Sequence, residues 1–291
     1  MLRNNRNRVY VDFPKVGLGN MLLLWARAVV FCKINNLELT TSSWWSFRWG
    51  ALLRRESKKR LYYNYFIESD TSSRIFSYIK KLFVPSIQNP ELKIITVQKK
   101  DFFIFNKVNI NEDLFLGLRN HKSLIKKKLE ESLHARIKIL LSKEPISDIS
   151  IHVRRGDFKN GNPLTPLSHF ISGISSIRNI TKKKLSVTIF SDASREELEP
   201  LFKLENIKLA NNNPDIVDIL LMSKSKIIFL SQSSSFSYWS AFLSDSLIIM
   251  HTNDWQQKIC DNDSNSKYME YRWVESENLP KELILNFLNI N

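Results

Sequence analysis

The stretch DIVDILLMSKSKIIFLSQSSSFSYWSAFLSDSLIIMH, residues 215–251, alternates between two hydrophobic patterns. Residues 215–223 and 234–243 have an apolar spacing that predicts helices, whereas 226–230 and 247–251 are short apolar runs that predict strands. Nearly unbroken apolar strands that alternate with helices are typical of a parallel sheet with both faces covered. This part of the chain therefore predicts the α/β class.

The same alternation extends toward the N-terminus. Strands are predicted at residues 148–153, 185–190 and 207–210, with helices at 166–178 and 194–202 between them. Repeated strand–helix units of this kind predict a Rossmann-like domain. Ligands of such a sheet bind outside the carboxyl ends of its strands, so the residues that follow each strand are the candidates for a site.

The start of the chain shows a shorter version of the pattern. Residues 9–13 predict a strand, 14–20 a loop with two glycines, and 21–34 a helix. Residues 112–143 predict mostly helix and are followed by Pro145 and a new strand. A domain boundary is therefore predicted after residue 143.

The composition indicates a globular protein with an anionic partner. The chain of 291 residues carries 43 Lys and Arg against 29 Asp and Glu, a formal charge of +14. Its hydrophobic content of 43% excludes global disorder. The positive charge favours nucleic acid, a phosphorylated substrate or an acidic membrane surface, and charge alone does not choose among them.

The cysteine usage and the N-terminal residues predict a cytoplasmic protein. Cys32 and Cys260 lie far apart and outside any metal-binding spacing, a usage typical of a reducing compartment. The N-terminal residues do not form a signal peptide. The longest apolar stretch, residues 21–34, is interrupted by charges and is shorter than the roughly 20 residues of a membrane span. Peripheral attachment to the inner face of a membrane stays open because of the charge.

The segment HVRRGD ends the strand predicted at residues 148–153. Side chains two apart on a strand share a face, so His152 and Arg154 project together. The forked donors of a guanidinium suit a phosphate, which makes this pair a candidate diphosphate site. The alternative is a surface salt bridge between Arg155 and Asp157 beside a hydrogen-bonded histidine.

The segment SQSSSF, residues 231–236, stands between a predicted strand and the helix 234–243. Hydroxyl groups and backbone N–H groups at a helix N-terminus can bind an anion. An ordinary serine N-cap is the alternative. The loop with Gly17, Gly19 and Asn20 lacks the third glycine and the lysine of nucleotide-binding loops, so it is a weak phosphate motif.

Acidic residues supply further candidates. Asp218 lies in an apolar helix, where a buried carboxylate is costly unless it is paired. The N–H groups of a purine base would pair it, as would a local N-cap or a lysine. Asp192, in SDAS, follows the next strand. The DND run at 261–263 resembles an Asp-x-Asp metal motif but follows no predicted strand, so we expect no metal site there.

Two other features have a simple structural interpretation. The run WWSFRW, residues 44–49, could stack on sugars or bases, although core packing is the commoner role of such a run. The five histidines show no metal-ligand spacing along the chain. No metal ligand set is therefore predicted.

Four segments together resemble a known family. HVRRGDF, then FSDAS, then DILLMSKSKIIFLSQSSSFSYWSAFL, with GLGN after the first strand, resemble the bacterial α-1,2-fucosyltransferases of glycosyltransferase family 11 and their superfamily of α-1,2-, α-1,6- and protein O-fucosyltransferases. The resemblance covers most of the C-terminal half and the first 35 residues. Two departures stand out: the first loop reads GLGNMLLLWA where many members have Gly-Gly-Leu-Gly-Asn-Gln, and SDAS has one acid where two are common.

The resemblance implies a GT-B-like architecture, with two Rossmann-like domains facing a cleft. It implies an acceptor-side α/β domain at residues 1–143, a GDP-sugar domain at 144–260, and a C-terminal segment, 261–291, that packs back on the N-terminal domain. The implied activity is inverting and needs no metal or other cofactor. L-Fucose would pass from GDP-fucose to a hydroxyl, expected to be galactose O2, of an oligosaccharide or glycolipid acceptor in surface polysaccharide or glycolipid synthesis.

The resemblance also implies roles for individual residues. Arg154 would bind the β-phosphate, with His152 and Arg155 beside it, and Asp218 would bind guanine. The remaining donor contacts would be Gly19, Asn20, Asp192, Ser234, Ser235 and Phe236. Asp157 and Asp12 are the candidates for a base that deprotonates the acceptor.

Two other functions stay open at this point. One is a related transferase that uses another sugar nucleotide. The other is a non-enzymatic basic protein that binds nucleic acid or an anionic membrane through the basic runs at 54–60, 126–128 and 182–184. None of these runs is interleaved with aromatic residues, as in proteins that bind single strands, so we expect no nucleic-acid partner.

Overall fold

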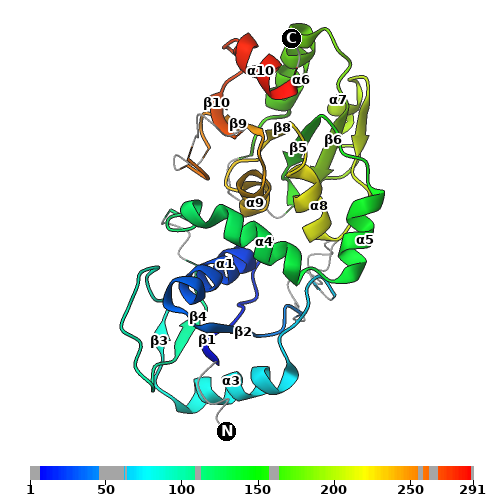
Figure 1. Cartoon of the computed structure of the whole chain (residues 1–291). Coiled ribbons are helices and arrows are strands. Elements are labelled where there is room, and N and C mark those ends of the chain that lie inside the picture. The colour runs from blue at the N-terminus through cyan, green and yellow to red at the C-terminus, as the bar shows by residue number, and fades with distance from the viewer. Residues whose placement is uncertain are drawn as a thin grey trace. The chain divides into compact units, whose positions relative to one another are not determined.

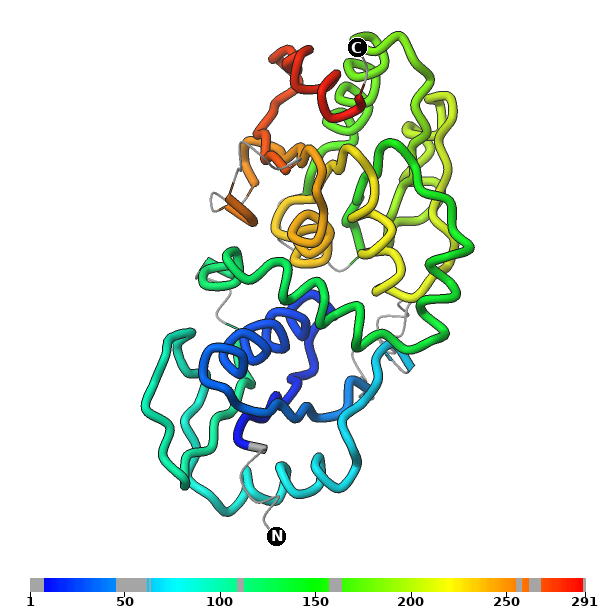
Figure 2. Tube along the Cα trace, in the orientation of Figure 1, coloured from blue at the N-terminus to red at the C-terminus, as the bar shows by residue number. Residues whose placement is uncertain are grey.

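The computed structural model describes residues 7–45, 62, 64–108, 113–156, 164–254, 258–261 and 268–289. The chain divides into two compact units, Met1–Lys138 and Ile139–Asn291, each with its own parallel sheet (Figures 1 and 2). The α/β class is confirmed. The division falls five residues before the boundary predicted after residue 143, because helix α5 (Ala135–Lys143) runs through it.

The first unit contains a four-stranded sheet in the order β2-β1-β4-β3, and every pairing is parallel. Its strands are β1 (Asn7–Val11), β2 (Glu38–Thr41), β3 (Ile87–Gln88) and β4 (Phe103–Phe105). Helices α1 (Leu18–Asn35) and α3 (Thr71–Phe83) lie on opposite sides of this sheet (Figure 1).

Helix α1 supplies the main apolar core of the first unit. Leu24, Ala28 and Phe31 pack against alternate residues of β1 and β4. By length and composition α1 could cross a membrane, but 72% of it is buried inside the protein, as a core helix is. Cys32 of α1 and Cys260 of the second unit are buried free thiols.

The predicted long helix at residues 112–143 is interrupted. The structure has η1 (Arg119–His121), α4 (Lys122–Ser132) and α5, and the break falls at Leu133, which is extended and bridges to Phe66. Trp44 stacks between Phe13 and Phe66, with 4.1 Å between ring centroids on each side. Core packing is therefore the role of this aromatic residue, whereas residues 46–49 and the basic run 54–60 lie outside the described residues.

The second unit contains a six-stranded sheet in the order β10-β9-β8-β5-β6-β7, again wholly parallel. The strands are β5 (Ile149–Val153), β6 (Val187–Ser191), β7 (Ile207–Leu209), β8 (Ile227–Phe229), β9 (Leu247–His251) and β10 (Met269–Trp273). Counted from β5, this is the 3-2-1-4-5-6 order of the Rossmann fold. The chain reverses direction across the sheet between β5 and β8.

The C-terminal segment corrects one prediction. Residues 261–291 were expected to pack back on the N-terminal domain, but β10 pairs with β9, and α10 (Lys281–Leu288) packs on α6 (Leu167–Thr181). Trp273 and Ile284 are buried in the core of the second unit. The segment is therefore the sixth strand and last helix of the C-terminal domain.

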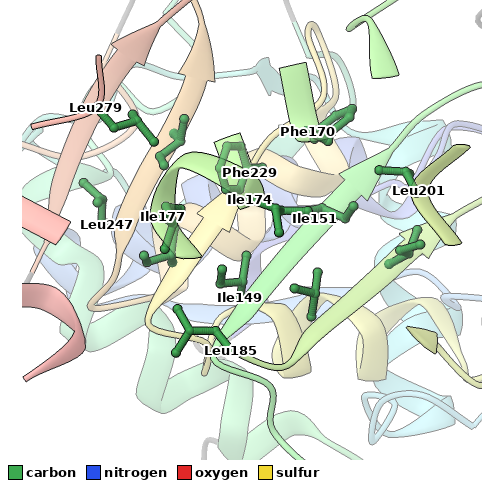
Figure 3. Packing of buried hydrophobic residues seen from close by; sticks show 14 of the residues in the cluster. Ile149, Ile151, Phe170, Ile174, Ile177, Leu185, Leu201, Phe229, Leu247 and Leu279 are labelled. Carbon is green, nitrogen blue, oxygen red and sulfur yellow. The ribbon is translucent and has the colours of Figure 1, made fainter. Parts of the chain in front are cut away.

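Helices cover both faces of this sheet. Helices α6, α7 (Glu199–Phe202) and α10 form one layer, and α8 (Asp215–Met222) and α9 (Ser235–Leu243) form the other (Figure 1). Figure 3 shows the first interface, where Phe170, Ile174 and Ile177 of α6 meet Ile149, Ile151 and Phe229 of the strands. A Cβ on Gly173 would lie 2.4 Å from the Phe229 ring, so the close approach of α6 to the sheet requires glycine there.

Candidate anion-binding site

The carboxyl ends of β5 and β8 meet at the point where the strand order reverses. Ser231, two residues after β8, links the two ends: its Oγ donates to the His152 carbonyl at 2.6 Å and accepts from the Arg154 N–H at 2.8 Å. Open α/β sheets bind ligands in the crevice at such a reversal. The structure therefore brings the predicted HVRRGD and SQSSSF segments together.

Arg154 and Asp192 form the charged part of the site. The Arg154 Nη1 forms an ion pair with Asp192 Oδ2, and both side chains are partly exposed. The other carboxylate oxygen, Oδ1, accepts from the Arg155 N–H at 2.8 Å. A Cβ on Gly156 would lie 2.3 Å from Asp192 Oδ2, so the backbone passes the carboxylate at a distance that only glycine allows. Asp192 thus orients the arginine loop.

Arg155 has a different environment from its neighbour. Its side chain is buried, with Nη1 donating to the Arg154 carbonyl at 2.8 Å and Nη2 donating to the Thr165 carbonyl at 2.9 Å. Burial lowers the pKa of the guanidinium, while Glu197 and Asp192 raise it. Both bonds hold the loop in place, so this geometry assigns Arg155 to positioning. Asp157, its alternative partner and a candidate base, lies outside the described residues.

The turn between β8 and α9 presents a helix N-terminus at the same edge. Ser234 occupies the N-cap position, but its side chain makes no capping hydrogen bond, and the first turn of α9 contains no acidic residue. The ordinary serine cap that the sequence left open is therefore not formed. Backbone N–H groups at a helix N-terminus carry partial positive charge and attract anions.

Tyr238 and Asp254, which the sequence did not indicate, hold this turn in place. Ser233 has a φ of 53°, in the left-handed region. Its N–H points to the Tyr238 hydroxyl at 2.8 Å and to Asp254 Oδ1 at 3.0 Å, and the Tyr238 hydroxyl donates to the same Asp254 oxygen. Asp254 lies after β9, so only the strand order brings it here.

His152 of β5 and Phe236 of α9 lie side by side. The two rings are stacked, with centroids 5.0 Å apart and an interplanar angle of 23°. His152 is buried, and its neighbours on β5 alternate toward the opposite face of the sheet. The structure thus places both predicted residues side by side, and it gives Phe236 a packing role.

Asp218 lies in the first turn of α8 and is buried. Because α8 follows β7 and packs beside α9, its first turn is at the carboxyl edge of the sheet, as the prediction requires. Asn213, just before α8, was not predicted. Its Nδ2 is buried and has no hydrogen-bond partner in the part of the chain that the structure describes.

The N-terminal candidates belong to the first unit. Helix α1 begins at Leu18, earlier than predicted, so Gly19 and Asn20 lie in its first turn. A Cβ on Gly17 would meet no atom within 4 Å among the described residues, so no close approach of that part of the chain explains this glycine. Asp12, a candidate base, forms an ion pair with Lys81 at 2.6 Å.

A histidine cluster lies behind the site. His169, His251 and Glu275 each place a potential ligand atom within 4.8 Å of the others, a proximity that the sequence spacing did not predict. The His251 Nδ1, however, accepts from the Asn253 N–H at 3.2 Å. A neutral imidazole with an accepting Nδ1 carries its proton on Nε2 and so offers no lone pair there to a metal.

His169 is the most buried member of this cluster. Burial, and then His251, lower the pKa of His169 to about 4, against the opposing effect of Glu275. Neither ring nitrogen has a hydrogen-bond partner among the described residues. His169 is therefore a neutral side chain of the core. Asp261, the first residue of DND, is described and exposed, and residues 262–263 lie outside the description.

The two parallel α/β units have the fold class of a GT-B glycosyltransferase. The chain matches the profile of glycosyl transferase family 11 over residues 68–275, and it belongs to that family, as the sequence resemblance implied. A search of curated proteins gives no significant match.

Three solved structures share the fold. NodZ α-1,6-fucosyltransferase co-crystallized with GDP is 12% identical, with a TM-score of 0.55 over 86% of this chain and 96% of that one. Fucosyltransferase NodZ from Bradyrhizobium is 11% identical, with a TM-score of 0.53 over 82% and 94%. POFUT1 in complex with GDP is 10% identical, with a TM-score of 0.50 over 84% and 98%. At these identities the likeness concerns the fold.

Proposed function

We propose that this protein transfers L-fucose from GDP-fucose to a hydroxyl of a glycan acceptor, with inversion at the anomeric carbon. Family membership supports glycosyl transfer, and the similar NodZ and POFUT1 structures contain GDP. The finer proposal is an α-1,2 linkage to galactose O2, in an oligosaccharide or glycolipid of surface polysaccharide synthesis.

One observation carries the proposal: Ser231 joins Arg154 to the turn that opens α9, at the reversal point of the sheet. A diphosphate at this point would meet a guanidinium and a helix N-terminus together. Both groups favour phosphate, one through forked charged hydrogen bonds and the other through the helix dipole.

The same pair suits the chemical step. As the bond between the anomeric carbon and the β-phosphate oxygen breaks, negative charge grows on the phosphate and positive charge on the sugar. Arg154 would stabilise the leaving group from a position fixed by Asp192. Charges held in place before the reaction are usually the largest contribution to catalysis. Asp192 and Arg155 serve as positioning residues in this scheme.

The guanine base would bind on the α8 side of the carboxyl edge of the sheet. The buried Asp218 carboxylate would accept hydrogen bonds from the N–H groups of guanine, which removes the cost of burying its charge. His152 and Phe236 would line the donor pocket on the second unit. Asp157 is the proposed base, because Asp12 is engaged by Lys81.

A thermal-shift experiment with the full chain tests the donor. GDP at a hundredfold excess over its Kd stabilises a binding protein by about 2.7 kcal/mol, so a clear rise in Tm is expected with GDP and a smaller one with UDP. Release of fucose from GDP-fucose, measured beside GDP-mannose and UDP-sugars, identifies the donor. Preference for a UDP-sugar would reject the proposal.

Metal dependence has its own test. Since Arg154 and the α9 N-terminus supply the positive charge, hydrolysis of GDP-fucose is expected to continue in EDTA. Loss of turnover in EDTA that Mn²⁺ or Mg²⁺ restores would show that a divalent ion takes part and would contradict this assignment.

A further inference from the structure

Helix α3 of the first unit presents its apolar face outward. Asp70 is the N-cap of this helix, and its carboxylate accepts from the Ser73 N–H at 3.1 Å. Six of its 13 residues are large apolar or aromatic side chains that are 48–79% exposed: Ile75, Phe76, Tyr78, Ile79, Leu82 and Phe83. A surface helix of a globular protein normally directs such a stripe toward the core.

The face of α3 that meets the protein is polar. Arg74 forms an ion pair with Glu68, and Lys81 forms one with Asp12 at 2.6 Å. Ser77, halfway between them, is the one buried residue of the helix. Residues spaced three or four apart share a helix face, so these contacts fix the rotation of α3 about its axis. Turning the apolar stripe inward would break both ion pairs.

The apolar stripe of α3 does not pack into the core beneath the helix. The apolar cluster on this side of the sheet consists of Tyr10, Phe102 and Ile104, with Val84 packed against it. It includes no residue of α3 among those that the structure describes. Contiguous exposed apolar patches of this kind mark surfaces that bind a partner or a membrane.

Basic side chains gather near the C-terminal end of α3. The Lys80 ammonium lies 4.6 Å from the centroid of the Phe102 ring, and it is close enough to Arg8 that the two charges repel. Arg8 donates to the Gln98 carbonyl at 3.0 Å, which places it beside the turn that carries the exposed Lys99 and Lys100. Arg8, Lys80, Lys99 and Lys100 form what we call the basic cluster.

We infer that α3 docks on an anionic lipid surface. Its apolar stripe, formed by Ile75, Phe76, Ile79, Leu82 and Phe83, enters the boundary between head groups and acyl chains, and the basic cluster meets lipid phosphates. An apolar helix face combined with positive charge is the pattern of helices that lie in the membrane interface. The inference goes beyond the proposed function, because it uses no residue of the donor site.

Vesicle flotation with the full chain provides the test. One set of vesicles contains phosphatidylcholine and phosphatidylglycerol in a ratio of about 3:1, and the other contains phosphatidylcholine alone. The protein is expected to float with the anionic vesicles and at least tenfold less with the neutral ones, because attraction to anionic lipids adds to the burial of apolar area in the binding of such a helix. Raising the salt to about 0.5 M should weaken binding through screening.

Variants of the apolar stripe locate the contact. Phe76→Ser/Ile79→Ser/Phe83→Ser is expected to bind anionic vesicles at least tenfold more weakly than wild type, with an unchanged circular dichroism spectrum. Ile67→Ser/Ile94→Ser removes exposed apolar side chains of the same unit outside α3, and it should bind within twofold of wild type.

Variants of the basic cluster test the charge. Lys80→Gln/Lys99→Gln/Lys100→Gln is expected to lose the preference for phosphatidylglycerol. The same number of substitutions in the second unit, at the exposed residues 182–184, should preserve that preference. A control that lost it equally would show that net charge alone drives binding, and the basic cluster would have no special role.

Three results would overturn the inference. In the first, the wild-type chain binds neither kind of vesicle, and in the second, the serine variant floats as wild type does. In the third, the wild type forms a dimer that the serine substitutions dissociate, which would make the face a contact between two copies. Hydrolysis of GDP-fucose measured without vesicles separates this test from the proposed function, since the substitutions in α3 leave the donor site unchanged.

Discussion

Two adjacent arginines at the end of β5 have different surroundings. Arg155 is buried and bonded to two backbone carbonyls, whereas Arg154 is partly exposed and paired with Asp192. The sequence predicted a site at this pair, and the family resemblance placed both arginines beside the β-phosphate. The distinction depends on the Thr165 carbonyl, which lies ten residues away, and no local pattern indicates where that carbonyl points.

The first prediction concerns Arg154→Lys, which keeps the charge and removes the planar fork. If Arg154 stabilises the departing phosphate, kcat should fall by about a hundredfold to a thousandfold, as for other preorganised donors. Tm should stay within a few degrees, and GDP affinity should change less than kcat, because the charge develops in the transition state.

The alternative for Arg154 is a solvated ion pair with Asp192, worth about 0–1 kcal/mol. In that case lysine would replace arginine almost freely. Steady-state hydrolysis of GDP-fucose distinguishes the two, and a lysine variant that keeps a third of the wild-type kcat would assign the arginine to structure.

Gly156→Ala is the second prediction at this scale. Its Cβ would lie 2.3 Å from Asp192 Oδ2, and that carboxylate cannot move without losing its bonds to Arg154 and the Arg155 N–H. We expect a cost of about 1–3 kcal/mol, seen as a lower Tm, together with slower donor hydrolysis. Gly17→Ala, at the N-cap of α1, where a Cβ meets no described atom within 4 Å, should lower Tm less than Gly156→Ala, because it loses only the N-cap preference for glycine over alanine. Equal Tm values for the two variants would contradict the packing argument.

At the scale of elements, apolar runs predicted the second sheet well except at its edge. Strands β5, β6, β8 and β9 are buried along nearly their whole length, and such runs are visible in the sequence. Strand β10, MEYRW, is mostly half-buried and mixes charged with aromatic residues. Its sequence gives no periodic signal, so pairing with β9 decides its structure.

Helix α3 illustrates another limit of sequence patterns. The spacing of apolar residues in TSSRIFSYIKKLF is typical of an amphipathic helix, and such patterns are normally taken to face a core. Here Arg74 and Lys81 form ion pairs on the face that meets the protein, and the apolar residues lie on the exposed face. Periodicity identifies the two faces of a helix, but tertiary contacts determine which face is outside.

The third prediction belongs to the turn before α9. Asp254→Asn keeps the size of the side chain but replaces the charged acceptor for the Ser233 N–H and the Tyr238 hydroxyl. Hydrogen bonds to a charged group contribute about 1.5–3 kcal/mol, so the turn should lose order and GDP should bind about tenfold more weakly. Asp254 lies outside the donor pocket residues, and calorimetric titration with GDP measures the change.

Tyr238→Phe is the matched variant for this turn, since it removes the hydroxyl that contacts both Ser233 and Asp254. It should weaken GDP binding in the same direction. GDP affinity that is unchanged in both variants would show that the turn keeps its shape without these bonds, and that Asp254 has no positioning role.

At the scale of the whole molecule, the sequence predicted the separate segments of the site but not that they lie together. His152, Arg154 and residues 231–236 were identified because they end or follow apolar strands. Their contact depends on β5 and β8 being neighbours, which follows from the strand order. The supporting residues Thr165 and Asp254 come from other connections, so only the folded sheet identifies them.

The fourth prediction concerns the pH dependence of stability. The pKa of His169 is about 4 in the folded chain and is ordinarily 6.5. Below about pH 6.5 the His169 imidazole therefore binds a proton in the unfolded chain, whereas in the folded chain it stays neutral until about pH 4. The free energy of unfolding should be insensitive to His169 above that pH, and it should fall by up to about 1.4 kcal/mol per pH unit between 6.5 and 4.

Denaturation at a series of pH values, on wild type and on His169→Asn, measures this contribution. The variant is expected to have a shallower decline between pH 6.5 and 4, whatever its stability at neutral pH. His134→Asn, in the first unit, serves as the control and should keep the wild-type slope. Identical slopes for wild type and His169→Asn would show that the buried imidazole does not contribute.

The two buried thiols make the chain suitable for single-site labelling. Burial raises the pKa of Cys32 to about 12, and Cys260 is also buried, so neither should react readily with a maleimide. A cysteine introduced at the exposed Lys183 would then be the one reactive thiol. Lys183 stands between α6 and β6, at the amino edge of the sheet and opposite the strand ends that carry the site. A fluorophore or a solid support attached there leaves the donor edge open to solution.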